Sequence, residues 1–322
     1  MKVIFIGGSG RSGSTIADLL LGQIPGFHSA GEIRLIWNRG FHEDRLCGCG
    51  TPFSKCDFWK QVVVRAFGSD AQSVAEEAQK LSRLVDRRVQ SHKFFFGRYS
   101  NSFAENLARY REILSNLYSA IHYEAGCKVI VDSSKFPNHG FVLAGMPSID
   151  LHVLHLVRDP RAVAFSWMRK RINPDVHWAR TYMGQYGPFV STRGWILSNL
   201  MVERLRRRVE KSCRLRYEDL VEDPTRVLES TLISLDILGD KTQDLSSPAW
   251  SLSRENHTVA GNPVRLSSGG LTLRLDDEWT RSLSRAAACF VSAAAMPWLM
   301  RYSYNVVPTR VSGPESAGND SR

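Results

Sequence analysis

The sequence has 322 residues, of which 43% are hydrophobic and 10% aromatic, a composition typical of a globular protein large enough to bury a substantial core. No apolar run approaches the roughly 20 residues of a membrane span, and the four-residue run at the start is too short for a secretory signal, so the six cysteines are expected to be reduced in the cytoplasm. The net charge of +10 suits anionic partners, but the basic residues lack the interleaved aromatics of a nucleic-acid surface, and no nucleic-acid partner is expected.

The chain opens with a predicted strand, a glycine-rich turn and a helix. Residues 3–6 are β-branched or aromatic without alternation, which is typical of a strand buried on both faces of a parallel sheet. Ile16, Leu19 and Leu20 then follow a helical period. Glycines at such a turn let backbone N–H groups and the helix dipole approach an anion closely. The turn therefore predicts a site for a phosphate or a phosphate-like ester.

The spacing Gly8-x4-Gly13 is that of a nucleotide-binding Walker A loop, but Ser14 stands where that loop has its lysine. The nearest cation is Arg11, which favours a less charged group, such as a sulfonate on a 5′-phosphate. Taken alone, the loop leaves a kinase and a sulfotransferase almost equally supported.

The segment Arg11-Ser12-Gly13-Ser14-Thr15 resembles the 5′-phosphosulfate loop of sulfotransferases that use 3′-phosphoadenosine 5′-phosphosulfate (PAPS), in their bacterial and tyrosylprotein branches. The resemblance implies that this loop, with Gly10 before it, binds the donor. It also implies that Arg11 acts in the transfer step itself.

A glycine–glutamate pair, Gly31-Glu32, follows the first helix. Sulfuryl transfer to a hydroxyl needs a base for the acceptor proton, and a carboxylate on the acceptor side meets that need. The resemblance implies this role for Glu32. His28 is the competing candidate base, and an ordinary salt-bridged glutamate is the structural alternative.

Three cysteines, Cys47, Cys49 and Cys56, lie within ten residues of one another. They are compatible with a zinc site that takes His42 as its fourth ligand, with a disulfide, or with a small structural loop. The structural loop is the favoured interpretation, and the resemblance implies no metal. From about residue 65 to 125 a helical pattern predicts an insertion that covers the sheet and shapes the acceptor pocket.

A second apolar run, residues 127–131, ends in Asp132 and is predicted to be a buried strand. An aspartate at this place imitates the metal-binding Walker B strand and supports a metal-dependent kinase as the alternative function. Lys135 follows three residues later. In the sulfotransferase interpretation Lys135 stabilises the leaving phosphate.

A third strand, residues 151–157, ends in Arg158, and Pro160 fits the first turn of a helix that carries Ser166. An arginine at a strand end and a serine two turns into the next helix converge on one phosphate. This pattern is similar to the 3′-phosphate site of sulfotransferases. A kinase has no reason to bind a 3′-phosphate.

The last part of the chain carries weaker signals. Residues 192–211 are predicted to be a helix whose basic end is a solvated face. The resemblance implies a late loop over the 3′-phosphate, to which Gly261 and Arg265 are assigned, although the common Arg-Lys-Gly form is absent. His257 is expected to be structural, and residues 307–322 are predicted to be a disordered tail.

The sequence predicts one α/β domain over residues 1–306, with the three-layer α/β/α arrangement of P-loop nucleotide-binding proteins, a central parallel sheet and the helical insertion. The resemblance implies a PAPS-dependent sulfotransferase acting on a hydroxyl or amine of a small-molecule, glycan, lipid or peptide acceptor, without a metal. A catalytically silent nucleotide-binding protein is the third hypothesis. Acceptor identity and oligomeric state are not encoded in these motifs.

Overall fold

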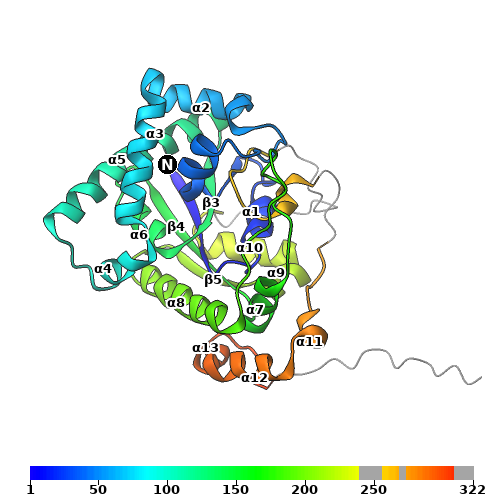
Figure 1. Cartoon of the computed structure of the whole chain (residues 1–322). Coiled ribbons are helices and arrows are strands. Elements are labelled where there is room, and N and C mark those ends of the chain that lie inside the picture. The colour runs from blue at the N-terminus through cyan, green and yellow to red at the C-terminus, as the bar shows by residue number, and fades with distance from the viewer. Residues whose placement is uncertain (239–255, 268–272, 308–322) are drawn as a thin grey trace, which may run out of the picture.

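A central sheet of five parallel strands organises the chain. The structure is a computed structural model that describes residues 1–238, 256–267 and 273–307, so the predicted disordered tail lies outside it apart from Val307. The strands lie in the order β2-β3-β1-β4-β5. Figure 1 shows the sheet at the centre of the fold, surrounded by helices. They are β1 (Lys2–Gly8), β2 (Phe27–Gly31), β3 (Val129–Lys135), β4 (Asp150–Val157) and β5 (Ser212–Arg216). The predicted α/β fold with a parallel sheet is confirmed.

Alternate residues of β1 face opposite sides of the sheet, as strand geometry requires. Ile4 and Ile6 pack in one apolar cluster, whereas Val3 and Phe5 pack in the other. All four side chains are fully buried, which explains why the sequence shows no polar alternation here. Helices therefore cover both faces and make the three-layer arrangement.

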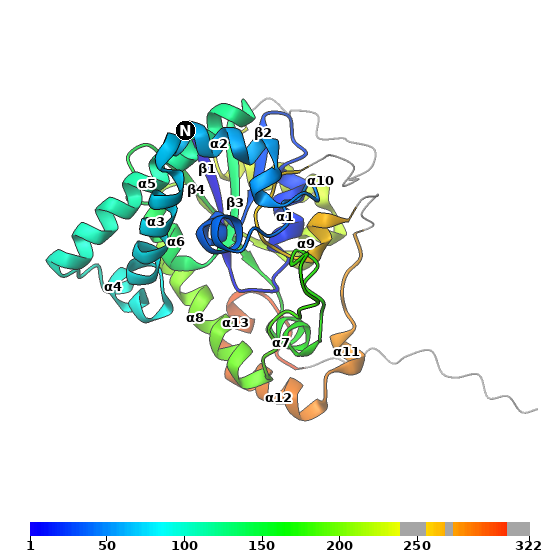
Figure 2. The same cartoon turned by 45° about the horizontal axis from the view of Figure 1, so that its top comes forward.

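One face of the sheet is covered by α1 (Ser14–Leu21), α9 (Tyr217–Glu222) and α10 (Pro224–Ser234). The opposite face is covered by α5 (Asn101–Ala125), α6 (Pro137–Leu143) and α8 (Pro188–Arg206). Figure 2 shows these two layers on opposite sides of the strands. The predicted basic helix thus corresponds to α8.

The region predicted as a helical insertion contains α3 (Ala71–Val85), α4 (Ser91–Phe96) and α5, preceded by α2 (Asp57–Phe67). α2 and α3 pack on α5 and share the apolar cluster that contains Val3 and Phe5 of the sheet. The cover over this sheet face is therefore continuous with the core. Its proposed role beside an acceptor stays a prediction.

Four further helices pack on α8 or on one another. They are α7 (Pro160–Met168), α11 (Trp279–Ser282), α12 (Arg285–Ala294) and α13 (Met296–Arg301). Two of them, α7 and α13, contribute to a third apolar cluster around Trp195 of α8. The remaining short helical turns are Ile33–Leu35, a π-helix over Ile36–His42, Phe53–Lys55, Gly68–Asp70, Arg88–Gln90 and Pro263–Leu266. Within the described residues, no helix combines the length and apolar character that crossing a bilayer requires.

Candidate active site

A cavity of about 510 Å³ opens where the five strands end. Because parallel strands present their carboxyl ends at one edge of the sheet, each strand delivers at least one lining residue there. These are Gly10 and Arg11 after β1, Glu32 after β2, Lys135 at the end of β3, Arg158 after β4 and Tyr217 after β5. Residues that the sequence placed in one site are thus brought together by the topology.

The cavity is strongly cationic. Among the described lining residues, six cationic side chains face two carboxylates, those of Glu32 and Asp276. The cations are Arg11, Arg39, Arg45, Lys135, Arg158 and Arg171. Like charges gathered in a partly desolvated space repel one another unless an anion joins them. The lining therefore fits a multiply anionic ligand.

The loop at residues 10–15, predicted to bind phosphate and here termed the phosphate loop, places the start of α1 at this cavity. Gly13 is the N-cap of α1 and adopts φ 87°, in the left-handed region that favours glycine. A Cβ at Gly13 would lie 2.2 Å from Cδ2 of Tyr217, so a side chain has no room there. No side chain caps α1, and its first turn holds no acidic residue, so its positive end is available to an anion.

All but one of the predicted loop residues line the cavity: Gly10, Arg11, Gly13, Ser14 and Thr15. The exception is Ser12, which is buried beneath them. Its hydroxyl oxygen has no partner among the described residues.

Arg11 lies in the loop with φ 68° and extends over the ring of Trp167, 4.8 Å from its guanidinium carbon to the ring centroid. Both terminal nitrogens lie 3.5 Å from the Met183 sulfur, a weak acceptor. Burial and, to a smaller extent, the charge of Arg171 lower the pKa of Arg11 to about 10, against a smaller opposing effect of Glu32. Arg11 is therefore a cation that the protein itself pairs poorly.

Glu32 and Lys135 form an ion pair at the ends of β2 and β3. Their side chains are 12% and 17% exposed, respectively, so the pair is largely shielded from water. The backbone N–H of Glu32 donates to the carbonyl of Val259 at 2.7 Å, which fixes the start of the turn that carries the carboxylate. The predicted base and the predicted cation are therefore direct neighbours.

Arg158 bridges the phosphate loop and the late part of the chain. Its guanidinium donates to the Arg11 carbonyl at 3.1 Å and to the Asp276 carbonyl at 3.2 Å, and it stacks on Tyr217. The neighbouring Asp159 pairs with Arg161 at 2.6 Å and not with Arg158.

The other predicted residues of the 3′-phosphate site differ in placement. Ser166 is buried and lines the cavity. Gly261 also lines it, and the next N–H, of Asn262, donates to Thr15 Oγ1 at 3.1 Å.

Arg265 does not line this cavity. Its guanidinium donates to the carbonyls of Thr258 at 2.8 Å and Leu46 at 2.7 Å, and it lies 3.4 Å from the Asp175 carboxylate. Arg265 is 2% exposed, so it is a buried residue that connects the segments around Leu46, Asp175 and Thr258. The geometry favours a structural Arg265 over the nucleotide contact predicted from the sequence.

Sequence reasoning missed three cations of the cavity, Arg39, Arg45 and Arg171. It also missed an aromatic wall formed by Tyr182 and Tyr186. Arg39 and Arg45 follow Glu32 within a short stretch, and this density of arginines was the available signal. Arg171 and the tyrosines belong to a loop without a motif.

Asp132, the residue that supported a kinase, is not among the residues that line this cavity. It is fully buried. Its carboxylate accepts hydrogen bonds from the Tyr118 hydroxyl and from the Ser134 N–H at 2.8 Å, and it lies 3.1 Å from His139 Nε2. A carboxylate so occupied is poorly placed to hold a nucleotide's metal ion. The geometry disfavours the kinase alternative.

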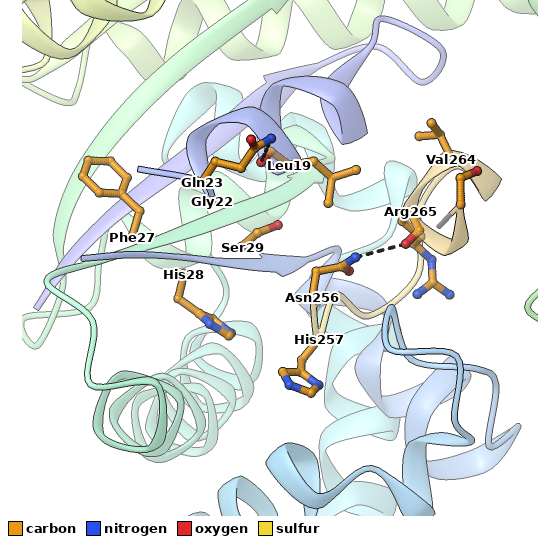
Figure 3. Close-up of a pocket in the computed structure, with 11 residues that line it drawn as sticks. Leu19, Gly22, Gln23, Phe27, His28, Ser29, Asn256, His257, Val264 and Arg265 are labelled. Carbon is orange, nitrogen blue, oxygen red and sulfur yellow. Dashed lines mark hydrogen bonds between the residues drawn. The ribbon is translucent and has the colours of Figure 1, made fainter. Parts of the chain in front are cut away.

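A second, smaller cavity of about 210 Å³ lies beside β2 (Figure 3). His28, the competing base, lines this cavity and not the cationic one. Burial lowers the pKa of His28 to about 4, with a smaller contribution from His257. His28 is thus a neutral, partly buried histidine that lies outside the cavity lined by the phosphate loop.

Comparison with known proteins supports the fold and the family. Residues 3–237 match the model of the sulfotransferase family. The sulfotransferase domain from the Synechococcus PCC 7002 olefin synthase is 21% identical, with 95% of each chain covered and a TM-score of 0.50. The sulfotransferase domain from the curacin biosynthetic pathway is 17% identical, covering 94% of this chain and 98% of that one, with a TM-score of 0.51. At these identities the likeness shows the fold alone, and curated protein sequences give no significant match.

Proposed function

Because this chain belongs to the sulfotransferase family, we propose that it transfers a sulfuryl group from PAPS to a hydroxyl or amine of an acceptor. The observation that carries the proposal is the shielded Glu32–Lys135 pair, which faces the same cationic cavity as the phosphate loop. A base, an anion-binding loop and a second phosphate site are the parts that this reaction needs.

The phosphate loop is proposed to hold the 5′-phosphosulfate of the donor. Backbone N–H groups at the start of α1 and the poorly paired Arg11 supply positive charge there. Arg158 and Ser166 are proposed to hold the 3′-phosphate. A dianionic phosphate at Arg158 would compete for its contact with Asp276, which now lies 3.3 Å away.

In the proposed transfer step, the acceptor oxygen attacks sulfur while Glu32 takes the hydroxyl proton. The bond between sulfur and the bridging oxygen of the 5′-phosphate breaks, and 3′-phosphoadenosine 5′-phosphate (PAP) leaves with that oxygen. Lys135 and Arg11 stabilise the negative charge that grows on the leaving phosphate. Since the donor is already activated, positioning and charge stabilisation account for most of the catalysis required of the protein.

The acceptor is proposed to enter on the side of Glu32, past Arg39 and Arg45. Tyr182 and Tyr186, at 44% and 48% exposure, give the cavity a partly open aromatic wall. Aromatic walls suit both sugar faces and aromatic rings. Glycan, lipid, phenol and peptide acceptors therefore all belong in a screen with radiolabelled PAPS.

Isothermal titration tests the donor assignment. We expect the protein to bind PAP more tightly than 5′-AMP, which lacks the 3′-phosphate, and more tightly than ATP with magnesium. Arg158→Ala should lose most of the difference in affinity between PAP and 5′-AMP. Because the contact is charge-assisted, the affinity for PAP should fall by about tenfold to a hundredfold. Arg226→Ala, an exposed arginine on α10, serves as the control and should bind PAP as the wild type does.

Two outcomes would argue against the proposal. Preference for ATP with magnesium would favour a kinase, despite the buried position of Asp132. Tight PAP binding without transfer to any acceptor or to water, unchanged in Glu32→Gln, would favour a silent nucleotide-binding protein.

A further inference from the structure

Three cysteines and one histidine meet outside the cationic cavity. Cys47, Cys49 and Cys56 come from the loop before α2, and His257 comes from the late segment 256–267. Their four potential ligand atoms all lie within 4.8 Å of one another. The proposed transfer reaction uses none of them.

We propose that these four residues bind a structural zinc ion. In a tetrahedral site with Zn–S bonds of about 2.3 Å, two sulfurs lie about 3.8 Å apart and a sulfur and a nitrogen about 3.6 Å apart. The Sγ atoms of Cys49 and Cys56 are 3.8 Å apart. The His257 Nδ1 lies 3.3 Å from Cys56 Sγ and 3.8 Å from Cys47 Sγ. These three distances are therefore close to the edges of a zinc tetrahedron, and no two of the four ligand atoms lie more than 4.8 Å apart.

The ligand set corrects the one considered from the sequence. His42 was the fourth ligand considered for a zinc site among the alternatives, but the structure brings His257 to the thiols. Three sulfurs and one imidazole nitrogen are a common structural zinc set, and four protein ligands leave no open position for a substrate or water. The proposed ion is therefore structural and takes no part in the transfer step.

A disulfide explains the cluster less well. It would join two sulfurs at about 2.05 Å and leave the third thiol and the imidazole without a purpose. All six cysteines of the chain are free thiols in the structure. The cytoplasm expected from the sequence keeps thiols reduced and available to a metal.

The surroundings hold the ligands in place. Cys47 and Cys56 are 1% and 2% exposed, which keeps water from the site. The His257 ring stacks on Phe58 at 4.9 Å, and its carbonyl accepts from the Trp59 indole N–H at 2.9 Å. Contacts that fix the ring of a ligating histidine are typical of the shell around a metal site.

The proposed ion would join two segments that build the acceptor side of the cavity. Figure 3 shows the His257 ring turned away from Arg265, while the adjacent Asn256 donates to the Arg265 carbonyl at 3.1 Å. Two residues after His257, Val259 hydrogen-bonds with Ala30 and Glu32 on the edge of β2. A zinc ion at His257 thus secures the strand segment that positions the proposed base.

The test uses the full-length protein, expressed with zinc in the medium, freed of any affinity tag and purified without chelators. Elemental analysis is expected to find one zinc per chain, released when a mercurial reagent blocks the thiols. Cobalt exchanged into the protein is expected to give the thiolate charge-transfer and intense visible bands of a tetrahedral, sulfur-rich site. Neither readout depends on activity.

Variants identify the ligands. Cys49→Ser and His257→Ala are expected to lower the zinc content and to change the cobalt spectrum. Cys127→Ser, Cys289→Ser and His42→Ala are the matched controls and should keep one zinc per chain. Because the wild-type measurements need no variant, a variant that fails to fold leaves the test intact.

The proposal is overturned if the wild-type protein carries no zinc and its cobalt form lacks thiolate bands. A Cys49–Cys56 disulfide found by mass spectrometry of the protein purified under reducing conditions would also overturn it. Zinc retained by His257→Ala but lost from His42→Ala would overturn the ligand set.

Discussion

The Glu32 carboxylate is paired directly with the Lys135 ammonium, across the ends of two neighbouring strands. Lys135 holds this position with φ 51°, an unusual backbone conformation for a residue with a side chain. Backbone strain of this kind is typical of functional sites, and here it places the ammonium group beside the Glu32 carboxylate. The pair therefore links the proposed base to the cation proposed for the leaving phosphate.

Replacing Glu32 with glutamine should slow transfer without weakening donor binding. Glutamine keeps the size of the side chain but does not accept the acceptor proton. We expect the rate constant for transfer to an acceptor found by screening to fall by about 10² to 10⁴. The affinity for PAP, measured by titration, should change by less than about threefold. This is well under the tenfold change in affinity that about 1.4 kcal/mol produces.

The companion variant Lys135→Met separates the two roles of the pair. If Lys135 stabilises the leaving phosphate, Lys135→Arg should recover part of the rate that Lys135→Met loses. Glu124→Gln, on the distant α5, should leave the rate unchanged. An unaltered transfer rate in Glu32→Gln would remove this residue from the mechanism.

Gly13→Ala is expected to damage both folding and PAP binding. The new Cβ would meet the Tyr217 ring at 2.2 Å, and φ 87° is unfavourable for alanine. A loss of about 2 kcal/mol or more in the free energy of unfolding follows from the strain and the clash. Gly187→Ala is the control, because that glycine has φ −70° and no atom within 4 Å of its added Cβ. Equal melting temperatures for the two variants would contradict the packing described for the loop.

Removing Arg171 should stabilise the free protein and weaken its binding of PAP. Burial and the neighbouring Arg171 together lower the pKa of Arg11, so the two protonated guanidinium groups disfavour one another. We expect Arg171→Met to raise the melting temperature without PAP and to reduce the increase that PAP produces. Differential scanning fluorimetry measures both. A lower melting temperature together with normal PAP binding would show that Arg171 is a structural residue.

Asp18 predicts a pH-dependent contribution to stability. Its carboxylate is buried on α1 and accepts from Ser29 at 2.7 Å and Ser133 at 2.8 Å. Burial raises its pKa from 3.8 to about 7, which outweighs the opposing hydrogen bonds. An acid with a raised folded-state pKa contributes stability that is complete below its unfolded pKa and lost as the pH rises through the folded pKa.

The advantage of the wild type over Asp18→Asn should therefore shrink as the pH rises from about 4 to about 7. The slope is expected to approach about 1 kcal/mol per pH unit. Urea unfolding of both proteins across this range isolates Asp18 from His28 and His155, whose folded pKa values of about 4 act in the opposite direction. Parallel stability curves for the two proteins would contradict the raised pKa of Asp18.

The sequence predicted those parts of the site that are local in the chain. The phosphate loop, Glu32 and Arg158 each follow a buried strand, so their convergence follows from the rule that parallel strands end at one edge. The fourth member of the cysteine cluster could not be predicted in this way. Cys56 and His257 are 201 residues apart, and only tertiary packing makes His257 a nearer partner than His42.

The placement of Arg265 could not be predicted from the sequence for a related reason. An arginine near a glycine in a late loop fits a phosphate contact and a structural role equally well. In both cases its five N–H donors form the hydrogen bonds, either to phosphate oxygens or to backbone carbonyls. The carbonyls of Leu46 and Thr258 decide its use, and neither is visible in the local sequence. Arg171 was missed because its loop, like many that line binding sites, carries no periodic pattern.

The bonds from Val259 to Ala30 and Glu32 also set an order of events during protein synthesis. All five strands of the sheet lie before residue 217, so the growing chain holds the complete sheet while the segment around Val259 is still unmade. Domains fold from the N-terminal side as they emerge, and contacts between distant residues form last. The nascent protein would thus hold the sheet edge that carries the residue 10–15 loop before the segment around Val259 is available to fix the turn at Glu32, the proposed base.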